Sequence, residues 1–157
     1  LKAGEVLLQV AAAGVNRADT SQRKGTYPVP AGASDILGME VSGTVVAMAA
    51  DVRQWQLGDQ VCALVTGGGY AELAAVKADR LTKLPDGLGY EQAASFAVTY
   101  ATSHVALAHR ARLKPGETLL VHGANSGIGV TAIQMAKAEM QQPNSTPLHW
   151  LPTQCTV

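Results

Sequence analysis

The sequence has few aromatic residues, few cysteines and no excess of charge of either sign. Aromatic residues make up 4% of the 157 residues, two residues are cysteine, and the formal net charge is zero. A domain that binds nucleic acid usually carries a patch of positive charge. The balanced charge therefore argues against a nucleic-acid partner.

Long apolar runs are also missing. The longest covers residues 44–50, far short of the ~20 residues that span a bilayer. No secretory signal precedes the first strand-like segment, so we expect no membrane attachment and a cytoplasmic location. Because the chain opens at Leu1 rather than Met, we expect the natural chain to begin upstream.

The cysteines and histidines lack the spacing of a metal site. Cys62 lies in an apolar run, where we expect a small buried side chain, and Cys155 is isolated. We expect no bound metal, and structural or exposed roles for His104, His109, His122 and His149.

The sequence is rich in small and apolar residues, with 47% hydrophobic residues and 16 glycines. Its first part contains strand-like runs separated by turns, with no long helix between them, which predicts a small β-barrel or sandwich. The predicted strands cover residues 6–10, 41–47, 60–65 and 70–76. A short helical turn is expected at 17–23 and an irregular loop at 24–34.

The pattern changes after Pro85-Asp86-Gly87. Helices are predicted at 91–96 and 99–111, an apolar strand at 118–122, and a helix at 128–139 after a glycine-containing turn. Strand, glycine turn and helix in this order open a parallel α/β sheet. The predicted fold class is therefore α/β overall.

The glycine turn, residues 123–129, carries the strongest chemical signal. Small residues let the backbone approach a pyrophosphate, and the following helix directs N–H groups and the positive end of its dipole at that anion. Counting back from Gly129, however, Ala124 and Ser126 stand where the dinucleotide fingerprint has glycines. The pattern alone leaves open a strand-to-helix connection that merely packs small residues, and it does not choose between NAD and NADP.

Several segments in order resemble quinone oxidoreductases of the zinc-independent branch of the medium-chain dehydrogenase/reductase family, in particular its p53-inducible branch. The matching segments are residues 4–19, 25–43, 57–61, 67–72, 113–117 and 122–137. The resemblance implies a GroES-like β-barrel domain for the substrate over residues 1–97, without its first strands. It also implies the first strand, turn and helix of an NADP-binding Rossmann domain over residues 98–138.

The implied activity is hydride transfer from NADPH to a quinone or another electron-poor alkene, in a protein for which a homodimer is possible. Zinc-dependent relatives place a cysteine where this chain has Asn16 and a histidine where it has Met39, so no zinc site is implied. Asn16 is a candidate to hydrogen-bond the substrate carbonyl or the nicotinamide ribose. Its alternative is a loop residue that satisfies its own backbone.

Other site residues follow from the same resemblance. Tyr27 is a candidate to orient a quinone, or is simply a loop aromatic. Thr99 matches a threonine beside the nicotinamide, or is a β-branched residue at a helix start. We expect an ion pair between Arg17 and Asp19. The pyrophosphate would be bound by the backbone N–H groups of Ala124, Ser126, Gly127, Ile128 and Gly129.

From about Glu139 the chain departs from the family pattern. Residues 139–157 contain three closely spaced prolines, so we expect an irregular tail. We interpret the chain as a truncated or splice form with reduced or no activity. Two alternatives stay open: an enoyl reductase domain of a polyketide or fatty-acid system, and a non-catalytic truncated module.

This interpretation predicts weak NADPH binding, because the half of the sheet that would bind the adenosine is expected to be missing. Calorimetric titration of NADPH into the chain should give a dissociation constant well above micromolar. An affinity in the micromolar range would contradict the expectation.

Overall fold

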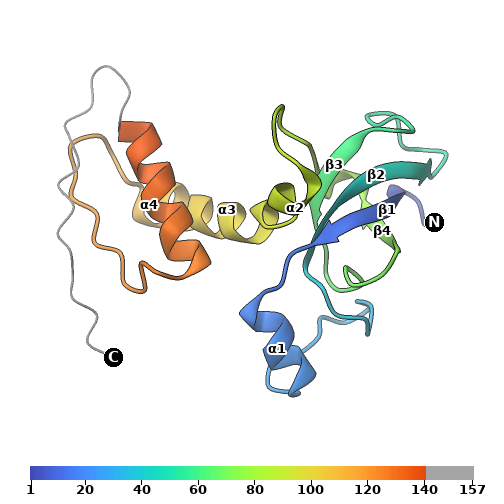
Figure 1. Cartoon of the computed structure of the whole chain (residues 1–157), viewed down its shortest axis with the longest axis horizontal. Coiled ribbons are helices and arrows are strands. Elements are labelled where there is room, and N and C mark those ends of the chain that lie inside the picture. Colours follow the sequence, from blue (N-terminus) through green and yellow to red (C-terminus); the bar gives the residue numbers. More distant parts are fainter. Residues whose placement is uncertain (141–157) are drawn as a thin grey trace. The chain divides into compact units, whose positions relative to one another are not determined.

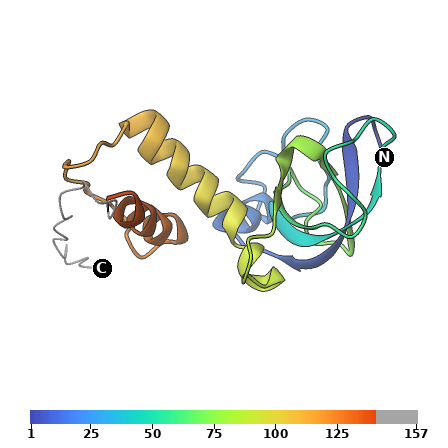
Figure 2. The same cartoon turned by 90° about the horizontal axis from the view of Figure 1, so that it is seen from above.

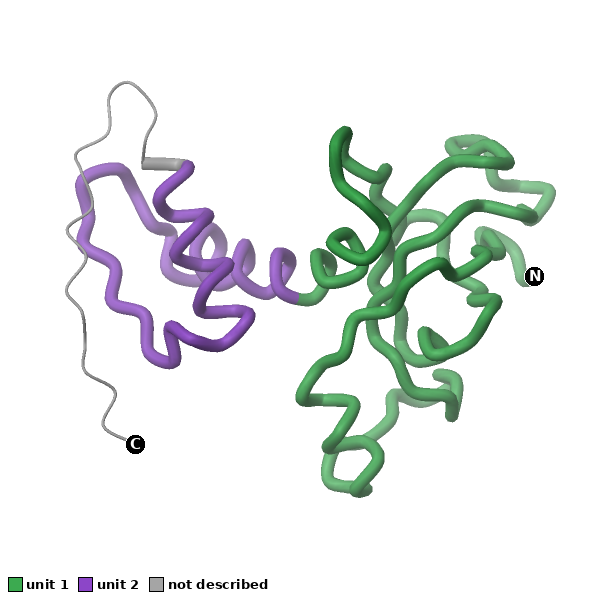
Figure 3. The backbone as a smooth tube through the Cα atoms, in the orientation of Figure 1, with its two compact units in different colours: residues 1–98 green, residues 99–157 purple. Residues whose placement is uncertain are grey.

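The computed structural model describes residues 1–140 of the chain, with side chains to residue 138 (Figure 1). The sequence expectation for the tail concerns residues that lie almost entirely outside this range. The chain divides into two compact units, residues 1–98 and residues 99–157, which are described separately (Figure 3).

The first unit contains one antiparallel sheet with strand order β4-β1-β2-β3-β5, which curves round on itself (Figure 2). Short helices lie between and after the strands. The elements are β1 (Glu5–Ala13), α1 (Arg17–Arg23), β2 (Glu40–Met48), β3 (Gln60–Leu64), β4 (Leu73–Lys77), the 3-10 turn η1 (Ala78–Arg80), β5 (Leu81–Lys83) and α2 (Tyr90–Ala93).

The four predicted strands are confirmed as β1 to β4, although β4 begins at Leu73 rather than residue 70. Alternate residues on them point into one core, as the period of two along a strand requires. Cys62 belongs to this interior with 1% exposure, and burial raises the pKa of its thiol. The most deeply buried apolar residues of the core are Val6, Leu8, Val41, Val45 and Val61.

Gly43 lets β1 and β2 approach closely at an irregular point of their pairing. The register shifts between Val10 and Ala12, opposite Gly43. A Cβ atom at Gly43 would overlap the carbonyl oxygen of Gln9 and lie 3.1 Å from the Cα of Val10. Because both obstacles are backbone atoms, they cannot move aside as a flexible side chain would.

A buried carboxylate fastens α1 to two loops. Asp19, 3% exposed, accepts hydrogen bonds at Oδ2 from the Asn16 N–H (2.8 Å) and the Tyr70 hydroxyl (2.9 Å), and at Oδ1 from the Gly38 N–H (3.3 Å). The predicted ion pair with Arg17 is wrong, since none joins these two described residues. Residues two positions apart on a helix do not face each other, so Arg17 is exposed while Asp19 points inward.

Helices are the only regular elements of the second unit over its described residues. A helix α3 (Phe96–His104), which begins in the first unit, continues as a π-helical segment η2 (Val105–Ala111), and α4 (Gly127–Met140) follows the glycine turn. The last helix is thus confirmed almost to the residue. Leu107, Ala132, Met135 and Ala136 form a small core. No helix within residues 1–140 is long and apolar enough to cross a membrane.

The strand predicted at residues 118–122 is wrong. Residues 118–121 have no regular secondary structure, residue 122 lies in a turn, and Leu120 is 63% exposed. An apolar run becomes a strand only when a neighbour supplies backbone hydrogen bonds, and every strand of the described residues belongs to the sheet of the first unit. In the second unit, only Leu119 of this run packs against the core.

We predict that Gly43→Ala lowers the free energy of unfolding by about 1–3 kcal/mol, because the added methyl group forces the backbones of β1 and β2 apart. Urea unfolding measures the change. The control is Gly89→Ala, where an added Cβ meets only the flexible ends of Glu91 and Gln92. This change should cost no more than about 1 kcal/mol, the effect of a poorer N-cap residue for α2. Equal effects at both positions would contradict this explanation.

Tyr70 gives a prediction at high pH. Burial first, and then the Asp19 carboxylate, raise the pKa of the Tyr70 hydroxyl to about 12 from an ordinary value of 10.0. A group with a raised folded pKa contributes its full stability below its unfolded pKa and loses it as pH rises through the folded pKa. Stability should therefore fall between pH 10 and about 12.

Urea unfolding across this range should show a smaller fall for Tyr70→Phe than for the wild type. Tyr27→Phe serves as the control, because no hydrogen bond within the described residues joins the Tyr27 hydroxyl to a carboxylate, as one joins Tyr70 to Asp19, and this change should leave the slope unchanged. The same fall in the wild type and Tyr70→Phe would refute the assignment.

Candidate functional site

Asn16 lies in the turn between β1 and α1, at the N-cap position of the helix. Its side chain is half-buried and its Nδ2 donates a hydrogen bond to Oε1 of Glu40 at 2.8 Å. Its backbone N–H donates to Asp19. The Asn16 amide thus has a hydrogen-bond partner 24 positions along the chain, at the start of β2.

Glu40 is the functional candidate that sequence reasoning missed. It begins β2, is 2% exposed, and accepts a second hydrogen bond at Oε2 from the Val98 N–H at 2.8 Å. Gly14 lies against it, and a Cβ there would overlap the Glu40 side chain and lie 2.5 Å from the Ala94 carbonyl oxygen. The available signal was a carboxylate at the start of a buried apolar strand, which must have a specific partner.

Tyr27 and Met39 belong to the long segment between α1 and β2. Tyr27 is 42% exposed, and no hydrogen bond within the described residues joins it to Asn16. Met39 is half-buried and immediately precedes Glu40. Within residues 1–138, no group of three or more histidine, cysteine, aspartate or glutamate side chains is arranged to hold a metal ion.

The glycine turn of the second unit is compact. A Cβ at Gly129 would overlap the Gly123 carbonyl oxygen and lie 2.8 Å from the Cα of Ala124, so the start of α4 packs directly on the turn. The Ser126 hydroxyl accepts a hydrogen bond from the Gly129 N–H at 3.0 Å, and the Ser126 N–H donates to the Gly123 carbonyl at 2.9 Å. Ser126 therefore caps α4.

Those hydrogen bonds separate four of the five predicted pyrophosphate donors into two pairs, and the fifth, Ala124, lies inside the turn. The N–H groups of Ser126 and Gly129 are already bonded within the turn. Gly127 and Ile128 lie in the first turn of α4, where a helix supplies no acceptor for its own N–H groups. Thr99 lies beside this end of the helix, since a Cβ at Gly127 would be 3.3 Å from its Cγ2.

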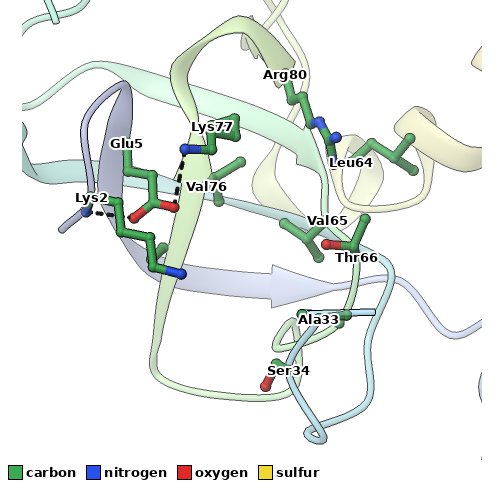
Figure 4. A pocket seen from close by; sticks show the side chains of 13 residues that line it. Lys2, Glu5, Ala33, Ser34, Leu64, Val65, Thr66, Val76, Lys77 and Arg80 are labelled. Carbon is green, nitrogen blue, oxygen red and sulfur yellow. Dashed lines mark hydrogen bonds and ion pairs between the residues drawn. The ribbon is translucent and has the colours of Figure 1, made fainter. Parts of the chain in front are cut away.

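A separate cavity of about 350 Å³ opens in the first unit and contains none of the predicted site residues (Figure 4). Lys2, Lys77 and Arg80 line it together with Glu5, and Lys77 forms a 3.4 Å ion pair with Glu5. The Lys2 backbone hydrogen bond and then Lys77 lower the pKa of Glu5. Sequence patterns gave no sign of this cavity, because its residues come from separate strands and loops.

The comparisons with known proteins agree with this geometry. The profile of the alcohol dehydrogenase GroES-like domain matches residues 2–86. The quinone oxidoreductase of Sus scrofa is 39% identical over 138 residues, which make up 87% of this chain and 42% of that protein.

Two solved structures are similar to the chain. The CurK enoyl reductase superposes with a TM-score of 0.80 at 30% identity, over 87% of this chain and 43% of that one. The quinone oxidoreductase of Thermus thermophilus, also solved in complex with NADPH, gives a TM-score of 0.72 at 40% identity, over 87% of this chain and 42% of that one. The chain thus spans less than half the length of these relatives.

The GroES-like match covers more than half of the chain, including all five strands, Asn16 and Glu40. It confirms the predicted α/β fold class with a GroES-like domain. The chain belongs to the family of the alcohol dehydrogenase GroES-like domain, on the zinc-independent quinone oxidoreductase branch of the medium-chain dehydrogenases/reductases.

Proposed function

We propose that the chain carries the substrate side and the first part of the cofactor side of an NADPH-dependent quinone oxidoreductase. The observation that carries this proposal is the half-buried Asn16 amide, which the buried Glu40 carboxylate holds in one orientation. The quinone oxidoreductases that are 39% and 40% identical to the chain support the substrate class and the cofactor.

The glycine turn fits a pyrophosphate. The close packing of Gly129 on Ala124 keeps side chains out of the turn, so a ligand can reach the backbone. The N–H groups of Gly127 and Ile128 and the dipole of α4 favour an anion there. Bound NADPH would supply the hydride, while Thr99 stands beside the start of the helix.

On the acceptor side, Asn16 has one side-chain N–H beyond the one that Glu40 accepts. A donor held in place stabilises the negative charge that builds on a quinone oxygen as hydride arrives. One quinone, one NADPH and one proton from solvent give a hydroquinone and NADP⁺. The exposed ring of Tyr27 is available to stack on the quinone.

A second candidate function is enoyl reduction, which the TM-score of 0.80 to the CurK enoyl reductase favours. The chemistry is related, because hydride again adds to an electron-poor double bond. Assaying one preparation with a quinone and with an enoyl thioester separates the two functions by their kcat/KM ratio.

The remaining alternative is a non-catalytic module that pairs with other subunits. It is consistent with exposed apolar side chains in the second unit, such as Leu120, Val105 and Val130. Gel filtration tests this alternative and the proposed homodimer together, since a module would elute as a defined complex only with a longer relative. For the proposed oxidoreductase we also infer a cytoplasmic location. Fluorescence microscopy of a tagged chain tests this location.

We predict that Asn16→Ala lowers kcat/KM for the quinone by about tenfold or more, because the lost donor acts on the charged transition state. The decrease of NADPH absorbance, followed at millimolar NADPH with and without quinone, measures the rate.

The matched control is Gln56→Ala, which removes an exposed amide with no side-chain hydrogen bond in the described residues. It should keep the wild-type rate. The proposal fails if the wild type shows no quinone-dependent oxidation of NADPH, or if Asn16→Ala keeps full activity.

A further inference from the structure

The Glu40 carboxylate is buried without a compensating cation. It is 2% exposed, and no lysine, arginine or histidine forms an ion pair with it in the described part of the chain. Its partners are two neutral N–H groups, one from Asn16 and one from Val98. Burying a carboxylate without a cation beside it lowers the stability of the fold, and an apolar side chain would fill the same space without that penalty.

The residues around Glu40 hold its side chain in one conformation. Gly14 packs on its side chain so closely that no Cβ fits, and Val98 lies in the first turn of α3, whose dipole favours a negative charge. Because one carboxylate oxygen is fixed on the backbone N–H of Val98, the other is aimed at Asn16. Glu40 thus connects the sheet, the turn after β1 and the start of α3.

A carboxylate only accepts hydrogen bonds, so the Asn16 atom that faces it must be the NH₂ group. Asp19 fixes the backbone of the same residue through its N–H. Two buried carboxylates therefore bind one partly exposed residue, Glu40 at its side chain and Asp19 at its backbone.

We propose that Glu40 is a positioning residue, whose carboxylate decides which end of the Asn16 amide faces Glu40 and which faces the substrate side. This inference rests on the proposed function of Asn16. Glu40 itself touches no reacting atom, and it acts only by holding the amide in the orientation that leaves one N–H as a donor.

The variant Glu40→Gln makes the proposal specific. The backbone of Val98 cannot turn over, so the carbonyl oxygen of the introduced glutamine must accept its N–H. The NH₂ group of that glutamine then lies against Asn16. Two NH₂ groups cannot hydrogen-bond each other, so the Asn16 amide must invert and accept through Oδ1. A nearly isosteric change at a buried position would thereby reverse a side chain at the site.

The donor and acceptor roles of Asn16 and Glu40 can also be exchanged by two substitutions. Asn16→Asp alone places two carboxylates in contact and should strongly lower the midpoint of urea unfolding. Adding Glu40→Gln restores a donor and an acceptor with their roles reversed. The double variant should therefore be more stable than Asn16→Asp, whereas independent roles would give additive losses.

The experiment measures urea unfolding, the ¹⁵N side-chain resonances of Asn16 and quinone reduction for the full chain and these variants. Glu40→Gln should shift the Asn16 amide resonances and lower kcat with the quinone by about tenfold or more, with KM for NADPH unchanged. The double variant should regain stability but not turnover, because an aspartate at position 16 donates no N–H. Glu72→Gln, a change at an exposed glutamate, should alter none of the three.

The positioning role is overturned if the Asn16 resonances are the same in the wild type and Glu40→Gln. It is also overturned if stability losses are additive, or if an active wild type and Glu40→Gln turn over quinone equally. Absence of turnover in the wild type would instead count against the proposed function, and the resonances and the unfolding cycle would still decide whether Glu40 orients Asn16.

Discussion

The two hydrogen bonds accepted by the Glu40 carboxylate join three parts of the first unit. The carboxylate itself begins β2, one of its oxygens meets the turn that leaves β1, and the other meets the start of α3. Sheets and helices pack through apolar contacts that tolerate small displacements, whereas a hydrogen bond specifies distance and direction. The carboxylate therefore sets the geometry of this region more strictly than the valine-rich core beneath it.

Asp19 repeats the same arrangement on a second set of partners. It gathers the N–H of Asn16, the hydroxyl of Tyr70 and the N–H of Gly38, from three separate loops. Gly38 has φ +104°, which side chains rarely adopt, and a Cβ there would lie 2.6 Å from the Tyr70 nitrogen. A glycine at position 38 thus lets its loop come close to the loop of Tyr70, where both loops hydrogen-bond the buried Asp19 carboxylate.

The sequence predicted the elements whose signal is local and repeated. Alternation of apolar residues identified β1 to β4, and small-residue helical periodicity identified α4. It missed β5, since three residues carry no usable period, and it wrongly predicted a strand at 118–122, since pairing depends on a neighbour that a one-dimensional pattern cannot supply.

The site was harder to predict because its contacts are distant in sequence. Asn16 and Met39 were found through family resemblance, but Asn16 meets Glu40 across 24 positions and Asp19 meets Tyr70 across 51. The supposed Arg17–Asp19 pair shows the opposite error, because proximity in sequence was mistaken for proximity in space. Where a buried carboxylate finds its donors is a property of the folded chain.

The serine in the glycine turn has a consequence for how ligand and fold are coupled. With Ser126 in place of glycine, the chain supplies its own acceptor for the Gly129 N–H, so the first turn of α4 is ordered before any anion arrives. A ligand that binds this turn does not have to order the first turn of α4. The entropic cost of ordering these residues is part of folding and does not weaken ligand binding. The same hydroxyl occupies the Gly129 N–H, which a glycine at position 126 would leave free to bind the anion. The turn is therefore ordered in advance but has one fewer N–H group for the ligand.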